Sequence, residues 1–260
     1  MHHDSMSEAN PRGGDVNLRS GPQMEEYRAI VARIAGDEPA GILDWGSGHG
    51  QVTSLLHEAG LAVTAFDYEP DAPDGSRPME RYPHLSVHLG SHPWRLPFED
   101  GSFAAVLSCG VLEHVGDPDA SLEEIRRVLA PGGTFYVYKL PNRRSYLEAI
   151  ARRMGLYYHG ACEHDKLYDL PEAVELLSRH GFAVGEARRM NVLPLTLTAN
   201  WAARSASRIW RANQRLSAVP GLNLIATNIE LVARAPASGQ SPSINRPAPT
   251  SAQATPAGRS

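Results

Sequence analysis

A glycine-rich turn follows the first strongly apolar segment of the sequence. Residues 41–44 read as a buried strand, and Gly46, Gly48 and Gly50 separate them from a helical pattern that begins at Gln51. Glycine lets the backbone approach a ligand closely, and the free N–H groups at the start of a helix bind polar or anionic groups. A tight strand–helix connection without a ligand would use the same glycines.

An aspartate at the end of the next predicted strand favours the ligand interpretation. Asp67 stands 21 residues after Gly46, where a carboxylate can accept hydrogen bonds from both hydroxyls of a ribose. The glycines are spaced G-x-G-x-G, and Gln51 takes the place of the third glycine in the dinucleotide pattern G-x-G-x-x-G. The sequence therefore predicts a nucleoside-containing cofactor without a pyrophosphate. A nicotinamide-dependent Rossmann oxidoreductase is the alternative enzyme.

Three further motifs follow the turn along the chain. They read LPFEDGSF at residues 96–103, VLEHV at residues 111–115 and LAPGG at residues 129–133. Together with the glycine turn, their order and spacing resemble the class I S-adenosylmethionine-dependent methyltransferases, in particular a methyltransferase type 11-like domain. The resemblance covers residues 42–142 and extends more loosely to Val232. It implies an enzyme that transfers a methyl group from S-adenosyl-L-methionine.

The same resemblance implies which residues contact the cofactor. The glycines of the turn would lie under the methionine moiety, and Asp44 would hold its amino group. Asp67 would bind the ribose, Tyr68 would pack on the adenine, and the backbone at Cys109 would line the sulfonium.

The sequence departs from the family pattern at two places that concern ligands. An acidic residue that often follows the third strand is replaced here by a segment containing Ser91 and His92, either of which could substitute for it. Some similar quinone-pathway enzymes carry an extra metal-binding glutamate where this chain has Gly110, so no metal is expected. The predicted cofactor-binding residues are Asp44, Gly46, Gly48, Gly50, Asp67, Tyr68, Ser91, His92 and Cys109.

His114 is the candidate catalytic residue. It follows Glu113 just past the predicted fourth strand, and a histidine there could accept a proton from an oxygen or nitrogen acceptor. Methyl transfer also proceeds through positioning and exclusion of water alone, without a base. A packing and helix-capping role for His114 is the alternative.

Apolar segments of strand and helix type alternate along the chain, which predicts a parallel sheet covered on both faces. We expect a doubly wound, mostly parallel seven-stranded sheet, the Rossmann-like methyltransferase fold, with a helical insertion before the last strand. Expected helices cover 24–34, 51–59 and 122–129, the last capped by Asp119, and another opens at Asp169 and Pro171. Expected strands cover 41–44, 62–67, 85–89, 104–108, 134–138, 182–189 and 224–232.

Composition sets the limits of the folded region. Residues 1–21 and 238–260 are polar or rich in Pro, Ser and Ala, which predicts disordered tails. Residues 22–237 form the expected domain, with a cofactor half at 22–138 and an acceptor half at 139–237. The beginning of the sequence lacks the pattern of a secretory signal, so a cytoplasmic location is expected.

Charge is divided unevenly between the two halves. Residues 1–138 contain 9 basic and 21 acidic residues, whereas residues 139–216 contain 13 basic and 7 acidic ones. Cations at Lys139, Arg143 and Arg144, followed by Arg152 and Arg153, favour an acceptor with a phosphate or carboxylate. We therefore expect an anionic small-molecule or lipid-linked acceptor.

A basic stripe marks the expected insertion at residues 198–216. Its spacing of i, i+4, i+7 and i+11 places four arginines on one face of a helix. Such a helix could rest peripherally on an anionic membrane, or it could be a lid with a solvated face. The four residues are Arg204, Arg208, Arg211 and Arg215.

Two other functions are weaker alternatives. A non-catalytic binding protein with the methyltransferase fold is disfavoured by the intact glycine turn and Asp67. A nucleic-acid partner is not expected, because the formal net charge is −4 and no base-binding motif of the Asn/Asp-Pro-Pro-Tyr type is present.

Overall fold

A seven-stranded sheet forms the centre of this computed structural model, which describes residues 20–68, 85–90, 92, 94–155, 165–197 and 199–237. The strand order is β3-β2-β1-β4-β5-β7-β6. Only β7 runs against its neighbours β5 and β6, so the predicted doubly wound, mostly parallel sheet is confirmed. The strands are β1 (Ile42–Trp45), β2 (Val63–Asp67), β3 (Val87–Leu89), β4 (Phe103–Cys109), β5 (Leu129–Pro141), β6 (Ala183–Met190) and β7 (Asn228–Arg234).

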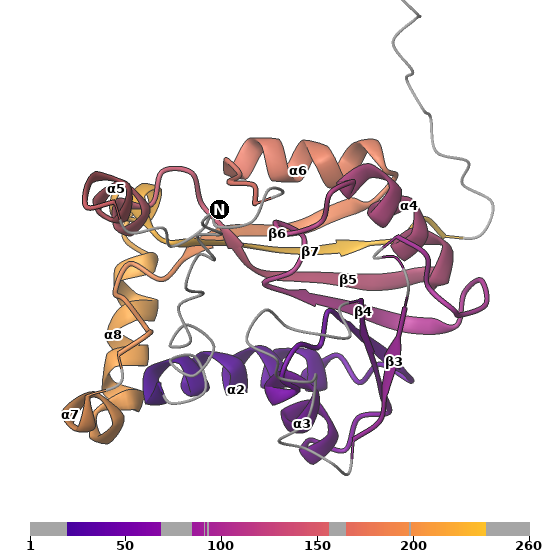
Figure 1. Cartoon of the computed structure of the whole chain (residues 1–260), viewed down its shortest axis with the longest axis horizontal. Coiled ribbons are helices and arrows are strands. Elements are labelled where there is room, and N and C mark those ends of the chain that lie inside the picture. The colour runs from indigo at the N-terminus through magenta and orange to yellow at the C-terminus, as the bar shows by residue number, and fades with distance from the viewer. Residues whose placement is uncertain are drawn as a thin grey trace, which may run out of the picture.

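Helices cover both faces of the sheet (Figure 1). Helices α2 (Gly21–Gly36) and α3 (Gln51–Glu58) lie on one face, and α4 (Pro118–Val128) and α6 (Leu170–Arg179) lie on the other. Alternate residues of a strand point to opposite faces, so Ile42 packs in the α2 core while Leu43 packs in the α4 core. Each such large apolar side chain stabilises the fold by about 1.5–3 kcal/mol when fully buried.

The cap of α4 differs from the prediction. The carboxylate that accepts a hydrogen bond from the first turn belongs to Asp117, through the Ala120 N–H at 3.0 Å, because the helix begins at Pro118. Asp119 therefore lies inside the first turn, where it pairs with Arg179 and His180. The predicted opening of a helix at Asp169 is confirmed for α6 by a capping box with Glu172.

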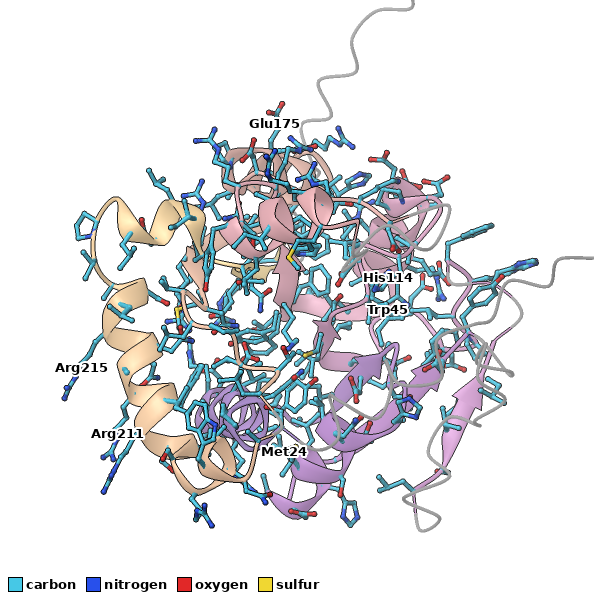
Figure 2. The ribbon with its side chains drawn as sticks, turned by 60° about the vertical axis from the view of Figure 1, so that its left-hand side comes forward. Met24, Trp45, His114, Glu175, Arg211 and Arg215 are labelled. Atoms are coloured by element: carbon cyan, nitrogen blue, oxygen red, sulfur yellow. The ribbon has the colours of Figure 1, made fainter. Side chains whose placement is uncertain are left out.

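The expected single insertion helix is two helices, α7 (Asn200–Arg204) and α8 (Ala206–Ser217). The break is at Ser205, whose φ and ψ of −109° and 10° are not helical. Arg204 therefore belongs to a different helix from the other three arginines, and the continuous stripe was a wrong prediction. Figure 2 shows Arg211 and Arg215 pointing outward from α8. No helix in the described part of the chain is long and apolar enough to cross a membrane.

Some predicted boundaries move. The last strand starts at Asn228, because residues Leu222–Ile225 form a short 3-10 helix. Strand β5 begins at Leu129, so it includes the Pro-Gly-Gly segment that we expected to lie between helix and strand. Ser20 caps α2 and Gly21 begins it, although both fall in the expected tail. The remainder of both predicted tails lies outside the described residues.

Candidate functional site

The glycine turn between β1 and α3 has the left-handed geometry that its sequence predicts. Gly46 and Gly48 have φ of +76° and +51°, conformations that residues with a side chain rarely adopt. A Cβ on Gly46 would lie 2.5 Å from a methyl group of Val111. Around Gly48 the space for a Cβ is open, so the backbone there is accessible to a ligand.

Asp67, at the carboxyl end of β2, fastens this turn. Its Oδ2 accepts a hydrogen bond from the Gly48 N–H at 2.6 Å, and its Oδ1 accepts one from the Tyr68 N–H at 2.7 Å. The side chain of Tyr68, the next residue along the chain, is 40% exposed. A partly buried carboxylate with fixed orientation, next to an exposed aromatic ring, fits a ribose and an adenine base.

The segment after β3 is described only in part. His92 stacks on Trp94 with ring centroids 5.6 Å apart, and both side chains are exposed. Ser91, which we predicted as an adenine contact, lies outside the described residues. The adenine contact of His92 stays a prediction.

Asp44 lies in β1 directly below the turn. It is buried, and its Oδ2 accepts a hydrogen bond from Thr53 Oγ1 at 2.5 Å. Burial raises the pKa of Asp44 to about 6. A buried carboxylate in a cavity wall favours a cationic partner, so Asp44 fits the amino group of a methionine moiety.

A cavity of about 660 Å³ extends from the glycine turn towards α2. It opens where β1 and β4 lie side by side and the strand order reverses, which is where open α/β sheets bind ligands. Cys109, the last residue of β4, and Gly110 after it form part of its wall. The contact of Cys109 with a sulfonium stays a prediction. Burial raises the pKa of the Cys109 thiol, so this side chain is a neutral wall residue.

His114 lines the same cavity and has an acidic partner on each side. Its Nδ1 lies 2.6 Å from Asp165 Oδ1, and its Nε2 lies 3.7 Å from Glu113 Oε1. The side chain is 46% exposed. Helix capping does not explain His114, because Asp117 caps α4. A carboxylate that orients one ring nitrogen leaves the other for proton transfer.

Glu113 is the buried member of this cluster. Its Oε2 has no hydrogen-bond partner within the described part of the chain, and burial raises its pKa to about 7. The Lys166 N–H donates to the Glu113 carbonyl oxygen at 2.9 Å, which holds the segment containing Asp165 beside the β4–α4 loop. Asp165 was not predicted, because 51 residues separate it from His114 and no local pattern links them.

Comparisons with known proteins decide the family. The family model described as a methyltransferase domain matches residues 43–137. The chain contains a class I S-adenosylmethionine-dependent methyltransferase domain. S-adenosylmethionine is the cofactor of this family, and the turn, Asp67 and Asp44 fit it. A cofactor of this kind supplies a methyl group activated by a sulfonium.

Relatives and solved structures resemble this methyltransferase domain. A Mycolicibacterium smegmatis protein described as a probable S-adenosylmethionine-dependent methyltransferase is 29% identical, over 61% of this chain and 56% of its own length. A Thermus thermophilus demethylmenaquinone methyltransferase is 32% identical, over 52% of this chain and 64% of its own. The chain thus spans between half and two thirds of these two relatives.

A solved structure shares the fold. It is Burkholderia thailandensis 1,6-didemethyltoxoflavin-N1-methyltransferase with bound 1,6-didemethyltoxoflavin and S-adenosylhomocysteine. Its TM-score is 0.54 at 21% identity, and the match covers 86% of this chain and 82% of that one. Likeness at this level of identity concerns the architecture of the methyltransferase domain.

We predicted cations at the cavity after β5, but Arg143 and Arg144 do not form part of its wall. Arg143 pairs with Asp169 and Glu172 of the α6 start, and Arg144 also pairs with Asp169. These ion pairs neutralise Arg143 and Arg144 and hold them against α6. Of the basic residues in the predicted segment, the described cavity wall contains Lys139.

The opposite wall of the cavity comes from residues that we did not predict. Gln23, Glu26 and Tyr27 on α2 line it, together with Asn191 after β6. A signal for α2 exists in the sequence, because Gln23 and Glu26 interrupt the apolar face that continues through Ile30 and Ile34. Asn191 carries no comparable signal.

Proposed function

We propose that this chain catalyses methyl transfer from S-adenosyl-L-methionine to a small-molecule acceptor, with His114 as the general base. The observation that carries this proposal is the continuity of one cavity from the glycine turn to His114. A cofactor seated on the turn and an acceptor beside the histidine would share this cavity. Proximity and exclusion of water would then supply much of the acceleration.

The proposed cofactor contacts are those implied by the resemblance, with roles that follow from their positions. Asp67 and Gly48 would hold the ribose side, Asp44 would hold the amino group, and Tyr68 would pack on the base. The backbone at Cys109 would lie beside the sulfonium.

The chemistry assigns one proton to His114. An acceptor hydroxyl would donate its oxygen lone pair to the methyl group that the cofactor supplies, and the electron pair of the broken carbon–sulfur bond would stay on sulfur. The hydroxyl proton passes to the neutral imidazole of His114, whose other nitrogen faces Asp165 at 2.6 Å. Asp165 would orient the ring and stabilise the imidazolium.

The proposed acceptor differs from the anionic one that the sequence predicted. The arginines of residues 143–144 are paired with acidic residues of α6, which removes the main reason to expect a phosphate or carboxylate there. Demethylmenaquinone methyltransferase, one of the relatives, is named for a quinone. A general base serves an acceptor whose reacting atom carries a proton, so a small or lipid-linked acceptor with a hydroxyl is the proposed substrate. A nucleic-acid acceptor is not part of the proposal.

The test combines cofactor binding with transfer of a methyl label. Calorimetry should show that S-adenosylhomocysteine binds and NAD does not. Incubation with methyl-labelled S-adenosylmethionine and a metabolite extract should label a small molecule. Tight NAD binding without a response to S-adenosylhomocysteine would support the oxidoreductase alternative, and cofactor binding without labelling of any acceptor would support the non-catalytic one.

The role of His114 is tested in the same assay. Substitution of His114 by Gln should lower turnover about 10²-fold or more while the melting temperature and the affinity for S-adenosylhomocysteine stay unchanged. Asp165→Asn should lower turnover less, because the imidazole is retained. Full turnover by His114→Gln would leave positioning alone as the mechanism.

A further inference from the structure

Two residues with unusual backbone geometry meet at one buried carboxylate in the cavity. Three described residues other than glycine have positive φ, and two of them are Lys139 at +61° and Asn191 at +71°. Lys139 Nζ donates to Glu26 Oε2 at 3.2 Å, and Asn191 Nδ2 donates to Glu26 Oε1 at 2.5 Å. Strained residues persist where the surrounding structure holds them, and they gather at functional sites.

A β-bulge explains how Lys139 reaches this carboxylate. The register between β5 and β7 shifts between Val137 and Leu140, and both of these residues pack in the core on the α4 face. Regular alternation would send Lys139 to that same core. The bulge instead directs it with Tyr138 towards α2, where it enters the cavity wall.

The ammonium of Lys139 retains donors for a ligand. Within the described chain it makes one hydrogen bond, to Glu26, and it lies 5.2 Å from the centroid of the Tyr27 ring. An ammonium carries three N–H donors, so two are left in a cavity wall. Glu26 is fully buried and keeps the ammonium charged and fixed in position.

Two neutral polar atoms in the same wall also lack partners. Gln23 Oε1 and Thr227 Oγ1 are buried without a hydrogen bond within the described residues. Gln23 Nε2 donates to the Tyr27 hydroxyl at 2.9 Å, and the Thr227 N–H donates to the Asn191 carbonyl at 2.9 Å. Both residues therefore belong to the surroundings of Lys139. Buried polar atoms without partners are costly, so a ligand that supplies them is favoured.

We infer that Lys139 binds the reacting oxygen of the methyl acceptor, and that Gln23 and Thr227 bind a second hydroxyl next to it. The acceptor class is thus a compound with two neighbouring hydroxyls, one of which is held as an oxyanion by the ammonium. Leu193 and Leu195 supply an apolar wall to the same cavity, which suits a ring. This inference rests on the proposed methyl transfer, and Lys139 would stabilise the oxygen whose proton His114 accepts.

The chain offers a direct probe of Lys139, because its two lysines are Lys139 and Lys166. Protein labelled with 13C at the lysine ε-carbon should give two side-chain signals, which Lys166→Arg assigns. With S-adenosylhomocysteine at saturation, catechol should shift the Lys139 signal and leave that of Lys166 in place. Aniline, which has no hydroxyl, should shift neither. No shift of Lys139 with catechol would overturn the inference.

Variants test the two hydroxyl contacts separately. Lys139→Met should weaken catechol binding about 10- to 150-fold, the loss expected for a hydrogen bond to a charged group. Gln23→Leu should weaken binding of catechol but not of phenol, which lacks the second hydroxyl. Lys139→Met leaves Glu26 without its partner and could fail to fold for that reason. In that case the double variant Glu26→Gln/Lys139→Met, which removes both charges, is measured instead.

The outcomes separate this inference from the proposed function. A Lys139 signal that moves with S-adenosylhomocysteine and not with catechol would assign the lysine to the cofactor and overturn the inference. Methyl-label transfer to an acceptor without adjacent hydroxyls would also overturn it and leave the proposed function standing. Failure of S-adenosylhomocysteine to bind at all would instead contradict the proposed function.

Discussion

The two sides of the cavity are built in different ways. The side proposed for the cofactor uses residues close together in sequence, between Asp44 and Asp67, and its geometry depends on backbone N–H groups of a glycine turn. The opposite side joins Glu26 to Lys139 and Asn191 across sequence separations of 113 and 165 residues, and it depends on buried charges. A substitution in the turn moves the backbone on which the cofactor would lie. A substitution in the cluster of Glu26, Lys139 and Asn191 changes a side chain that an acceptor would meet. We expect perturbations of the first side to abolish cofactor binding and those of the second to alter the acceptor.

The largest effect is expected from Gly46→Ala. A Cβ there would meet Val111 at 2.5 Å and would be strained at a φ of +76°, so the turn must move. We expect the affinity for S-adenosylhomocysteine, measured by calorimetry, to fall more than about 100-fold, which corresponds to roughly 2.7 kcal/mol. Gly36→Ala at the end of α2 is the matched control, because its Cβ would meet nothing within 4 Å. Equal affinity in both variants would show that the turn does not carry the cofactor.

Asp67→Ala should have a smaller effect on the same side. The carboxylate loses both its hydrogen bond from Gly48 and its contact with the ribose, so we expect a loss of about 1.5–3 kcal/mol in cofactor affinity. Asp67→Asn preserves the shape and should lose less. The dissociation constant of catechol, measured in excess S-adenosylhomocysteine, should stay unchanged in both. An unchanged affinity for S-adenosylhomocysteine would show that the ribose is held elsewhere.

The pH dependence of cofactor binding gives a more modest contrast. Asp44 has a pKa of about 6 in the free protein because it is buried, and the amino group of the cofactor favours its ionised form. Affinity should therefore fall as the pH drops below about 6, by up to about tenfold per pH unit. Folding of the free protein depends on pH in the opposite direction. Because burial raises the pKa of Asp44, the free energy of unfolding falls as the pH rises through about 6.

Two variants identify the titrating group. Asp44→Asn should abolish the pH dependence of S-adenosylhomocysteine affinity between pH 5 and pH 7. Glu113, whose pKa is raised to about 7, also lines the cavity, so Glu113→Gln is the second variant. If Glu113→Gln removes the dependence and Asp44→Asn does not, the cofactor amino group is held elsewhere.

We expect the smallest effect from substitutions of the arginines in the insertion. The arginines at 204, 208, 211 and 215 are exposed, so their replacement by Gln should change the free energy of unfolding by less than about 0.5 kcal/mol per residue. Removal of four charges should still weaken any binding to anionic liposomes, and salt should weaken it in the wild type. Equal sedimentation of both proteins with liposomes at low salt would make these arginines a solvated surface.

Features set by neighbouring residues were predictable from the sequence. The turn, the strand before it and Asp67 follow from glycine spacing and apolar runs, and the capping box at Asp169 follows from its Asp-x-x-Glu pattern. The mostly parallel order of the strands in the sheet follows from the alternation of strands and helices along the chain. For the same reason, the family could be inferred from residues 42–142.

Features that depend on distant partners were not predictable. The arginines at 143 and 144 carry no sign in the sequence that α6 will neutralise them. The break at Ser205 and the cap at Asp117 result from competition between adjacent candidates, which spacing alone does not decide. The left-handed conformation of Lys139 arises from the register of β5 against β7, strands that are far apart along the chain.

The bulge in β5 has a thermodynamic consequence for the order of binding. The Gly110 N–H donates to the Tyr138 carbonyl at 3.0 Å beside the proposed cofactor, and the next residue, Lys139, faces the proposed acceptor. Tyr138 and Lys139 share one peptide bond, so we expect a ligand that moves one of them to move the other. Binding of the two ligands should therefore be cooperative, and reciprocity requires the same factor in whichever order they are added. A double titration would measure that factor directly.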